Sequence, residues 1–341
     1  MFLLILGCAT TGALRVDPDV LPVLPSPRAD QYTRVPSASR DPLVASVSDG
    51  LPWDEALSGV AGAVALAELE GETVDACRLR WMAILAGYPY PLLARASVSV
   101  PEGEVPATLV AEARKQAGAR VDVGLVRARG RDTDRWVLVV GEHTAELPAI
   151  PREVARGEVV TLGAGDWSVS DPFGQLRPVA GSFVADAQGE WMLSARDGAR
   201  TIATFPVYVD EEARALPPFA CTAASGDPLA QATGIVRAVR AGYGFTDLTR
   251  DPALDSVARA RLRALLAGGP VPDARAQLRA AGFIGVPVAA AACSGATVEA
   301  CLSQIWWSPE GRGALVGDLA DVGIAVESSG GDVHMVVLGA G

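Results

Sequence analysis

The C-terminal stretch of this 341-residue chain carries the pattern that most constrains its fold. Thr297 to Ile305 is predicted to be helical, and Trp306-Trp307-Ser308-Pro309-Glu310-Gly311-Arg312 follows directly. A proline fixes φ and removes a backbone donor, so the Ser-Pro step should end this helix. Two extended runs follow, Asp321 to Val326 and Val333 to Leu338, around the turn Ser328-Ser329-Gly330-Gly331. The pattern predicts a helix, a break and a closing β-hairpin.

Composition and charge narrow the range of partners. The formal net charge is −11, and there are only two histidines, His143 and His334. Nucleic acid and anionic membrane surfaces attract clustered Lys and Arg, so we expect no direct binding to either. The chain contains no Cys-x-x-Cys pair, Gly-x-Ser-x-Gly elbow or Ser-x-x-Lys motif. The sequence therefore predicts no cofactor, no metal site and no catalytic residue.

The N-terminus, Met1-Phe2-Leu3-Leu4-Ile5-Leu6-Gly7-Cys8-Ala9, resembles the lipobox of a bacterial lipoprotein signal. That resemblance makes residues 1–8 the signal and Cys8 the lipidated residue. The run is short and lacks a preceding Lys or Arg, and a frayed apolar terminus with a buried cysteine is the other interpretation. No later run reaches the ~18 apolar residues of a membrane span, so lipid would be the only anchor. We expect an exported protein facing the periplasm or the cell surface, and Ala9 favours the outer membrane.

Residues 9–44 are predicted to be a tether. They contain six prolines among scattered Ser, Asp and Arg. Because proline fixes φ and lacks a backbone donor, such a segment favours extended, solvated chain. A spacer of this kind would hold the folded part away from the membrane, where its partner would be an unknown ligand or an envelope protein.

The cysteines suggest disulfides if Cys8 carries lipid. The four others are Cys77, Cys221, Cys293 and Cys301, and four cysteines allow three pairings. Cys293 and Cys301 are the nearest in sequence, and closing so short a loop would stabilise the fold by roughly 2–3 kcal/mol. Two free buried thiols are the alternative to that pair. A bridge from Cys77 to Cys221 would join two domains.

Residues 45–142 are predicted to form helices followed by a β-hairpin. The helical runs are Pro52–Leu69, Val74–Leu85 and Leu109–Gln116, and the hairpin strands are Val121–Val126 and Arg135–Val140.

This hairpin resembles the C-terminal one. Asp122-Val123-Gly124 matches Asp321-Val322-Gly323, and Trp136 and Met335 each stand twelve residues past the glycine. An apolar strand follows in both cases. Either residues 45–142 are a diverged copy of the C-terminal domain, or two hairpins are alike by chance.

Residues 147–210 are predicted to form a small all-β sandwich, with residues 211–229 as a linker. Short apolar runs recur about every ten residues between Gly, Asp and Pro. Gly189-Glu190-Trp191 resembles the Gly-x-Tyr motif of bacterial immunoglobulin-like modules. Trp191, Leu193 and Ala195 alternate with polar residues, so Trp191 is interpreted as a core residue rather than a ligand platform.

From Ala230 onward, residues 230–341 resemble the CAP superfamily, also called SCP-like domains. Leu248-x-x-Asp251-Pro252-x-Leu254 is similar to the family's "L-x-x-D-P-x-L" motif. Trp307 to Arg312 is similar to its "W-x-x-S-P-G-H-R" motif, and Asp321 to Val326 to its "IGVG" strand. The resemblance implies a three-layer α-β-α sandwich. The whole chain is therefore predicted to be α+β and multidomain, with N-terminal helices plus hairpin, a central sandwich and this C-terminal domain.

The departures from the family pattern concern chemistry. The family's cleft holds two histidines and two acidic residues, which suit a divalent metal. Gly311 occupies the histidine position of the Ser-Pro motif, and no histidine lies between Leu266 and Arg279. Val286 to Ala292, where the family has a glutamate, contains no carboxylate. Glu299 and Glu310 remain without a positioned partner.

These observations favour a non-catalytic, membrane-anchored lipoprotein with a degenerate CAP-like domain. Its role would be binding or structural at the cell envelope. The alternative is a cell-wall or polysaccharide hydrolase that uses carboxylates not placed by the sequence, which would need two of them facing a cleft about 5–10 Å apart.

Overall fold

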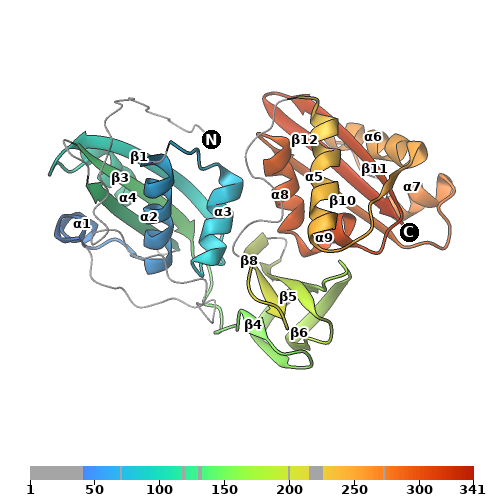
Figure 1. Ribbon diagram of the computed structural model, residues 1–341, viewed down its shortest axis with the longest axis horizontal. Helices are drawn as coiled ribbons and strands as arrows, with labels where there is room; N and C mark the ends of the chain where they lie inside the picture. Colours follow the sequence, from blue (N-terminus) through green and yellow to red (C-terminus); the bar gives the residue numbers. More distant parts are fainter. Residues whose placement is uncertain are drawn as a thin grey trace. The chain divides into compact units, whose positions relative to one another are not determined.

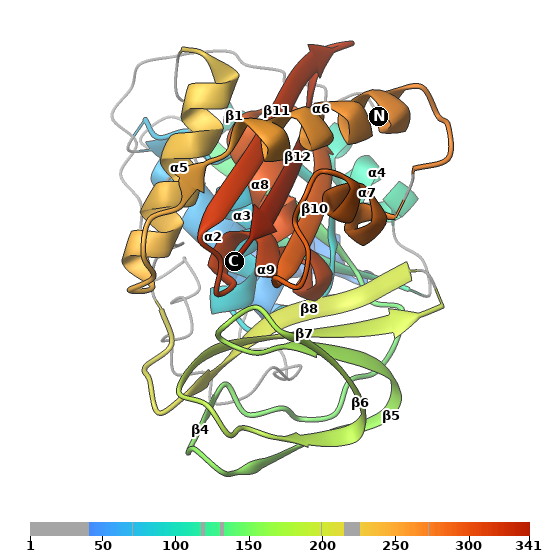
Figure 2. The ribbon, with the colours of Figure 1, turned by 90° about the vertical axis from the view of Figure 1, so that its right-hand side faces the viewer.

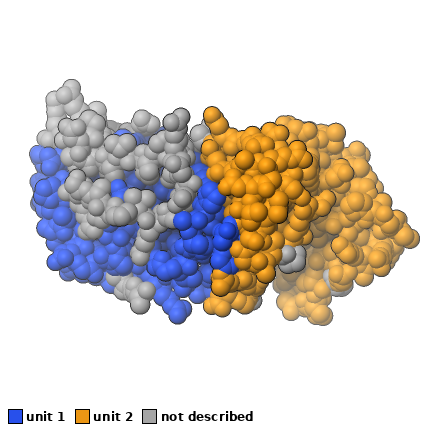
Figure 3. All heavy atoms as spheres, turned by 90° about the horizontal axis from the view of Figure 1, so that it is seen from below, with its two compact units in different colours: residues 1–152, 161–163, 200–203 blue, residues 153–160, 164–199, 204–341 orange. Residues whose placement is uncertain are grey.

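The computed structural model describes residues 41–341 except 70, 117–119, 130–132, 199, 215–225 and 272. The predicted signal, Cys8, nearly all of the predicted tether and Cys221 lie outside these residues. The chain divides into two compact units, which are described separately (Figure 3). Unit 1 runs to Arg152 and includes residues 161–163 and 200–203; unit 2 contains residues 153–160, 164–199 and 204–341.

Unit 1 contains helices packed on a three-stranded antiparallel sheet with the order β1-β3-β2 (Figure 1). Its elements are α1 (Pro42–Ser48), α2 (Glu55–Leu69), α3 (Ala76–Leu85), β1 (Leu92–Pro101), α4 (Ala107–Gln116), β2 (Val121–Arg129) and β3 (Thr133–Glu142). Helix α1 begins inside the predicted tether because Asp41 caps it, accepting from the backbone N–H of Leu43 at 2.8 Å.

Helix α2 lies directly on strand β2. The Asp54 carboxylate caps this helix by accepting from the Leu57 N–H at 2.9 Å, and the Asp54 N–H donates to the Val123 carbonyl at 3.0 Å. A Cβ placed on Gly124 would lie 2.2 Å from the Leu57 backbone. Only glycine permits so close an approach of helix to strand.

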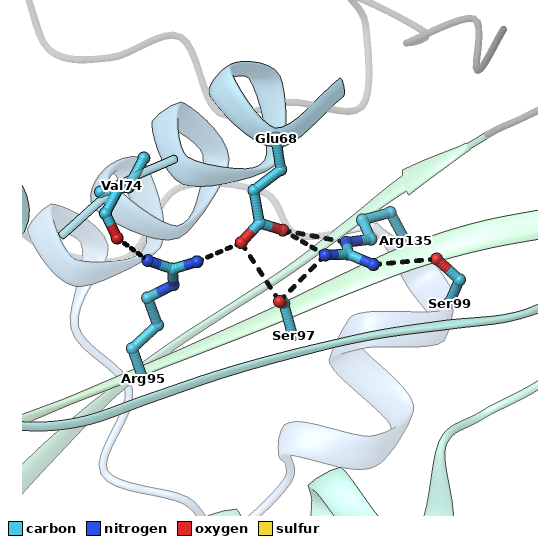
Figure 4. A network of polar contacts seen from close by, with 6 residues as sticks. All are labelled: Glu68, Val74, Arg95, Ser97, Ser99 and Arg135. Atoms are coloured by element: carbon cyan, nitrogen blue, oxygen red, sulfur yellow. Dashed lines mark hydrogen bonds and ion pairs between the residues drawn. The ribbon is translucent and has the colours of Figure 1, made fainter. Parts of the chain in front are cut away.

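A polar network fixes the far end of α2 over the sheet (Figure 4). The Glu68 carboxylate pairs with Arg95 and, at 2.5 Å, with Arg135. Ser97 donates to Glu68 at 3.2 Å, and Arg135 donates to Ser99 at 3.1 Å. Because Glu68 is only 11% exposed, these contacts replace the hydration that its charge loses.

The central segment forms one five-stranded sheet with the order β4-β8-β7-β5-β6, strongly curved in Figure 2. Its strands are β4 (Glu153–Val154), β5 (Val159–Ser170), β6 (Leu176–Val184), β7 (Gly189–Asp197) and β8 (Arg200–Val209). Trp191 is buried in its core, with its ring 5.3 Å from that of Phe183 and its indole N–H donating to Ala187.

The C-terminal domain has three layers, with α6 and α7 on one face of a four-stranded sheet and α5, α8 and α9 on the other (Figures 1 and 2). The sheet order is β10-β12-β11-β9. The elements are α5 (Pro228–Gly242), β9 (Thr249–Arg250), α6 (Pro252–Leu266), α7 (Ala274–Ala280), β10 (Val288–Gly295), α8 (Val298–Trp306), α9 (Pro309–Val316), β11 (Asp321–Ser329) and β12 (Asp332–Ala340). The predicted α+β, multidomain class is confirmed.

The two α/β parts share internal features. In both, a strand from outside the hairpin pairs with the hairpin's second strand, which gives the orders β1-β3-β2 and β10-β12-β11. A parallel bridge precedes the long helix in each, Trp53 with Val123 and Arg250 with Val322. A Cβ on Gly323 would lie 2.3 Å from the Leu254 backbone, as at Gly124 in unit 1.

Most of the curved sheet belongs to the same compact unit as the C-terminal domain; only residues 161–163 of β5 and 200–203 of β8 belong to unit 1. The loop between β5 and β6 meets α9 at Gly174, whose φ is +75° and whose added Cβ would lie 2.6 Å from the Cα of Gly313. Strands β6 and β7 also contact α9. Contacts between residues distant in sequence therefore join segments that composition alone separates.

Gly323→Ala should destabilise the protein by at least about 2 kcal/mol, because the new methyl group would overlap the backbone of α6. Gly234, an exposed residue of α5 with no atom within 4 Å of its added Cβ, provides the control. Gly234→Ala should instead stabilise by up to about 1 kcal/mol through helix propensity. Urea unfolding of both variants measures this, and equal stability of the two would contradict the close contact.

Candidate functional site

The Ser-Pro segment forms the start of α9. The Ser308 side chain caps the helix by accepting from the Gly311 N–H at 3.1 Å, and Pro309 occupies the first turn. This arrangement turns Arg312 inward, where it is fully buried. The break that the sequence predicts is therefore a helix cap that positions a buried cation.

Arg312 lies between an acidic residue and an aromatic ring. Its Nη1 is 3.3 Å from Oε1 of Glu190, and both side chains are 0% exposed. Its guanidinium carbon lies 4.3 Å from the centre of the Trp306 ring. Glu190 comes from the start of β7, so the curved sheet supplies the counter-charge for a cation of the C-terminal domain. Both interactions offset the cost of removing the guanidinium from water.

Two more side chains complete the surroundings of the Glu190 carboxylate. Tyr243, which follows α5, donates its hydroxyl to Oε2 of Glu190 at 2.7 Å. Arg214 has its Nε 3.6 Å from the same oxygen and its guanidinium 3.9 Å from the Tyr243 ring centre. Burial raises the pKa of Tyr243, and the negative charge of Glu190 raises it further.

Several polar atoms at this site have no hydrogen-bond partner among the described residues. They are Nε, Nη1 and Nη2 of Arg312, Nε1 of Trp306, Nε of Arg214 and Oε1 of Glu190. Because native proteins pair most buried polar groups, this cluster has unused capacity to bind an anion or water. Chemically, the site can hold a carboxylate between guanidinium, phenol and indole donors.

Glu310 belongs to the neighbouring surface of unit 2. Its Oε1 accepts from Nη1 of Arg196 at 2.8 Å and from Ser168 at 3.4 Å, and its Oε2 accepts from Ser308 at 3.0 Å. Its side chain is 41% exposed. The carboxylate that the sequence leaves without a positioned partner thus has an arginine partner from β7.

The remaining predicted positions are Glu299, Gly311 and the cysteines 293 and 301. Glu299 is buried in the first turn of α8. A Cβ added to Gly311 would lie 3.2 Å from the Ile305 carbonyl and 3.4 Å from Ala291, so neighbouring atoms fill the place of a side chain there. Cys293 and Cys301 form a disulfide that joins the end of β10 to α8.

Cys77 is also disulfide-bonded. The predicted partner Cys221 lies outside the described residues, so the bridge from Cys77 to Cys221 stays a prediction.

The two histidines lie in different units. In unit 2, His334 of β12 shares a hydrogen bond of 2.7 Å between Nδ1 and the Ser294 hydroxyl on β10. In unit 1, Nδ1 of His143 is 3.2 Å from the buried Asp122 carboxylate, and its Nε2 is 3.4 Å from Glu146.

The His143 cluster is a feature that sequence reasoning missed. The Tyr90 ring lies 4.7 Å from the imidazole, and the Tyr88 hydroxyl donates to Asp122 at 3.4 Å. Burial raises the pKa of Tyr88, and the charges of Asp122 and Asp54 raise it further. Asp122 is the first residue of the Asp-Val-Gly sequence that the two hairpins share. The sequence around His143, however, contains no pattern that predicts its contact with Asp122.

Two features are absent from the described residues. No group of three or more His, Cys, Asp or Glu side chains is placed to hold a metal ion. Within the same residues, no helix combines the length and apolar character needed to cross a membrane.

Comparison with known proteins gives little likeness. No protein-family model and no curated protein matches the chain. Among solved structures, the chain is similar to a cysteine-rich secretory protein from Staphylococcus aureus subsp. aureus Mu50, with 12% identity and a TM-score of 0.28. The match covers 63% of this chain and 79% of that one. The fold assignment therefore depends on the chain's own strand order and contacts.

The raised pKa of Tyr243 has a measurable consequence. A tyrosine whose pKa is higher in the folded state stabilises the fold fully below about pH 10, and this stability is lost as the pH rises above that value. Tyr243→Phe should leave the alkaline absorbance step at 295 nm unchanged in native protein and reduce it by one tyrosine in denatured protein. A smaller native step in the variant would show that Tyr243 ionises freely.

Proposed function

We propose that this protein is a non-catalytic envelope lipoprotein whose degenerate CAP-like C-terminal domain has a binding or structural role. The main support for this proposal is the set of contacts made by the Ser-Pro-x-x-Arg segment, residues 308–312. Arg312 is fully buried against Glu190 of the curved sheet, and Glu310 pairs with Arg196 of the same sheet. The groups of this segment are thus engaged in holding a second part of the chain, which is a binding arrangement rather than a reactive one.

The CAP-like assignment rests on element order and layering. Helix α8, the capped Ser-Pro step and the β11–β12 hairpin follow the family's order, and helices cover both faces of the sheet. Residues 45–142 are a diverged second copy of this domain. Their matching strand order, parallel bridge and helix-contacting glycine support duplication over chance likeness of two hairpins.

Location follows from the N-terminal sequence. The Leu-Gly-Cys run at residues 6–8 and the proline-rich segment behind it favour export and attachment through lipid on Cys8. Each buried methylene of an acyl chain contributes ~0.8 kcal/mol, so several chains hold a protein firmly to a membrane. The protein would face the periplasm or the cell surface, with the outer membrane favoured, and bind a ligand or an envelope protein there.

Lipidation can be tested in the native host. Mass spectrometry of the mature N-terminus should find an acylated Cys8, because the lipobox motif makes that cysteine the first residue. Cys8→Ala should move the protein from the membrane fraction to the soluble fraction. Cys77, which is disulfide-bonded, is not a matched control, so Gly234→Ala at an exposed position of α5 serves instead. An unmodified Met1 on the native protein would end the lipoprotein proposal.

The absence of catalysis is tested with purified protein. We expect no stoichiometric zinc and no product from peptidoglycan or polysaccharide, because Glu310 is held by Arg196 and the side-chain position at Gly311 is filled. Metal analysis and a dye-release assay measure the two. Glu299→Gln and Glu310→Gln should leave background release unchanged. Zinc bound one per chain, with turnover that Glu310→Gln abolishes, would favour the hydrolase instead.

A further inference from the structure

We propose that the C-terminal domain contains a carboxylate-binding pocket, formed by Arg312, Tyr243 and Trp306 with Arg214, that the chain's own Glu190 occupies. The ligand class that it would take is a carboxylate-bearing molecule or an acidic side chain of a partner. This inference deepens the binding role proposed above and rests on it, but it does not depend on lipid attachment.

The pocket recognises a carboxylate by charge and by hydrogen bonding. The Glu190 side chain is 0% exposed, so its charge depends on the protein groups around it. A phenol donates to it at 2.7 Å, and guanidinium nitrogens lie 3.3 Å and 3.6 Å from its oxygens. The Arg312 guanidinium is held over the Trp306 ring, which itself lies 5.1 Å from the Tyr243 ring. Neighbouring aromatic rings, tilted by 45° to each other, thus flank the donors.

Glu190 fills this pocket incompletely. The side chains of Arg312 and Trp306 are fully buried. None of the three Arg312 nitrogens donates a hydrogen bond to a described residue, and neither does the indole N–H of Trp306. Oε1 of Glu190 likewise accepts no hydrogen bond from any described residue, although it lies 3.3 Å from Nη1 of Arg312. Arginine binds a free carboxylate best through two parallel hydrogen bonds. The single tethered carboxylate from β7 does not reach that geometry, so a free carboxylate could pair more of the donors.

The donors and the occupant come from different parts of unit 2. Tyr243, Trp306 and Arg312 belong to the C-terminal domain, whereas Glu190 is in the first residues of β7. The pocket is therefore assembled mainly by the C-terminal domain and filled by a side chain of the curved sheet, as a ligand would fill it. The nearby pair of Glu310 and Arg196 differs, because its side chains are 41% and 32% exposed and it provides a matched control.

Acetate tests the pocket directly. Glu190→Ala removes one methylene and the carboxylate, the atoms that acetate can replace. In thermal unfolding, sodium acetate should raise the Tm of this variant with saturation, because a ligand that binds only the folded state stabilises it. Sodium chloride at equal ionic strength and neutral acetamide should not. Wild-type protein, whose pocket is occupied, and Glu310→Ala should show no saturable response to acetate.

A second variant links the effect to the named donors. Tyr243→Phe in the Glu190→Ala background should weaken acetate binding at least about tenfold, because a hydrogen bond to a charged group is lost. If Glu190→Ala does not fold in chloride, the yield of refolded protein in acetate against chloride becomes the measurement. No acetate response, an equal response to chloride, or no refolding in either salt would overturn the inference. The outcome of the acetate experiment does not depend on the mass of the N-terminus or on the hydrolysis assays. The pocket proposal and the lipoprotein proposal can therefore fail independently of each other.

Discussion

The buried guanidinium of Arg312 sets the arrangement of unit 2. Removing a cation from water is strongly unfavourable unless an anion and hydrogen-bond acceptors replace the solvent. The C-terminal domain supplies an aromatic ring for Arg312 in Trp306 and a hydroxyl donor for its partner in Tyr243, while the counter-charge is Glu190 of the curved sheet. Separating the sheet from the domain would leave both charges uncompensated. The sheet and the C-terminal domain are therefore joined electrostatically as well as through the contact of Gly174 with Gly313.

Much of the fold could be predicted because its signals are local. The N-cap residues Asp54 and Asp251 each accept from backbone N–H groups of a helix whose run the sequence indicates, whereas Ser308, which the sequence marks only as a break, caps the additional helix α9. Both β-hairpins follow from apolar runs around polar turns. The Asp-Val-Gly matches also point to positions where a strand meets a helix backbone, since glycine at 124 and at 323 is required by contact rather than by a turn.

The strands that the sequence did not reveal depend on distant partners. Strand β10 has the sequence VAAAACSG, and alanine favours helix, yet pairing along β12 from Ala340 to Val333 holds it extended. Strand β1 alternates Ala94, Ala96 and Val98 with polar residues, but small side chains make that alternation weak. The site around Arg312 could not be predicted for the same reason, because its partners are distant in sequence. Glu190 and Arg312 are far apart in the chain, and no local pattern identifies a charge whose partner lies on another element.

The two α/β parts share a close contact between helix and glycine but differ in the side chains around it. In both, a long helix approaches the central hairpin through a glycine, so the backbone contact is fixed and the side chains beyond it can vary. Under α6 and α7 the sheet face is apolar, with Leu262, Leu278 and Val336 in one cluster. Under the end of α2 the equivalent region holds the charges of Glu68 and Arg135 instead. A fold of this kind does not by itself specify function, so the proposed binding role of unit 2 depends on the side chains that meet where the curved sheet contacts α9.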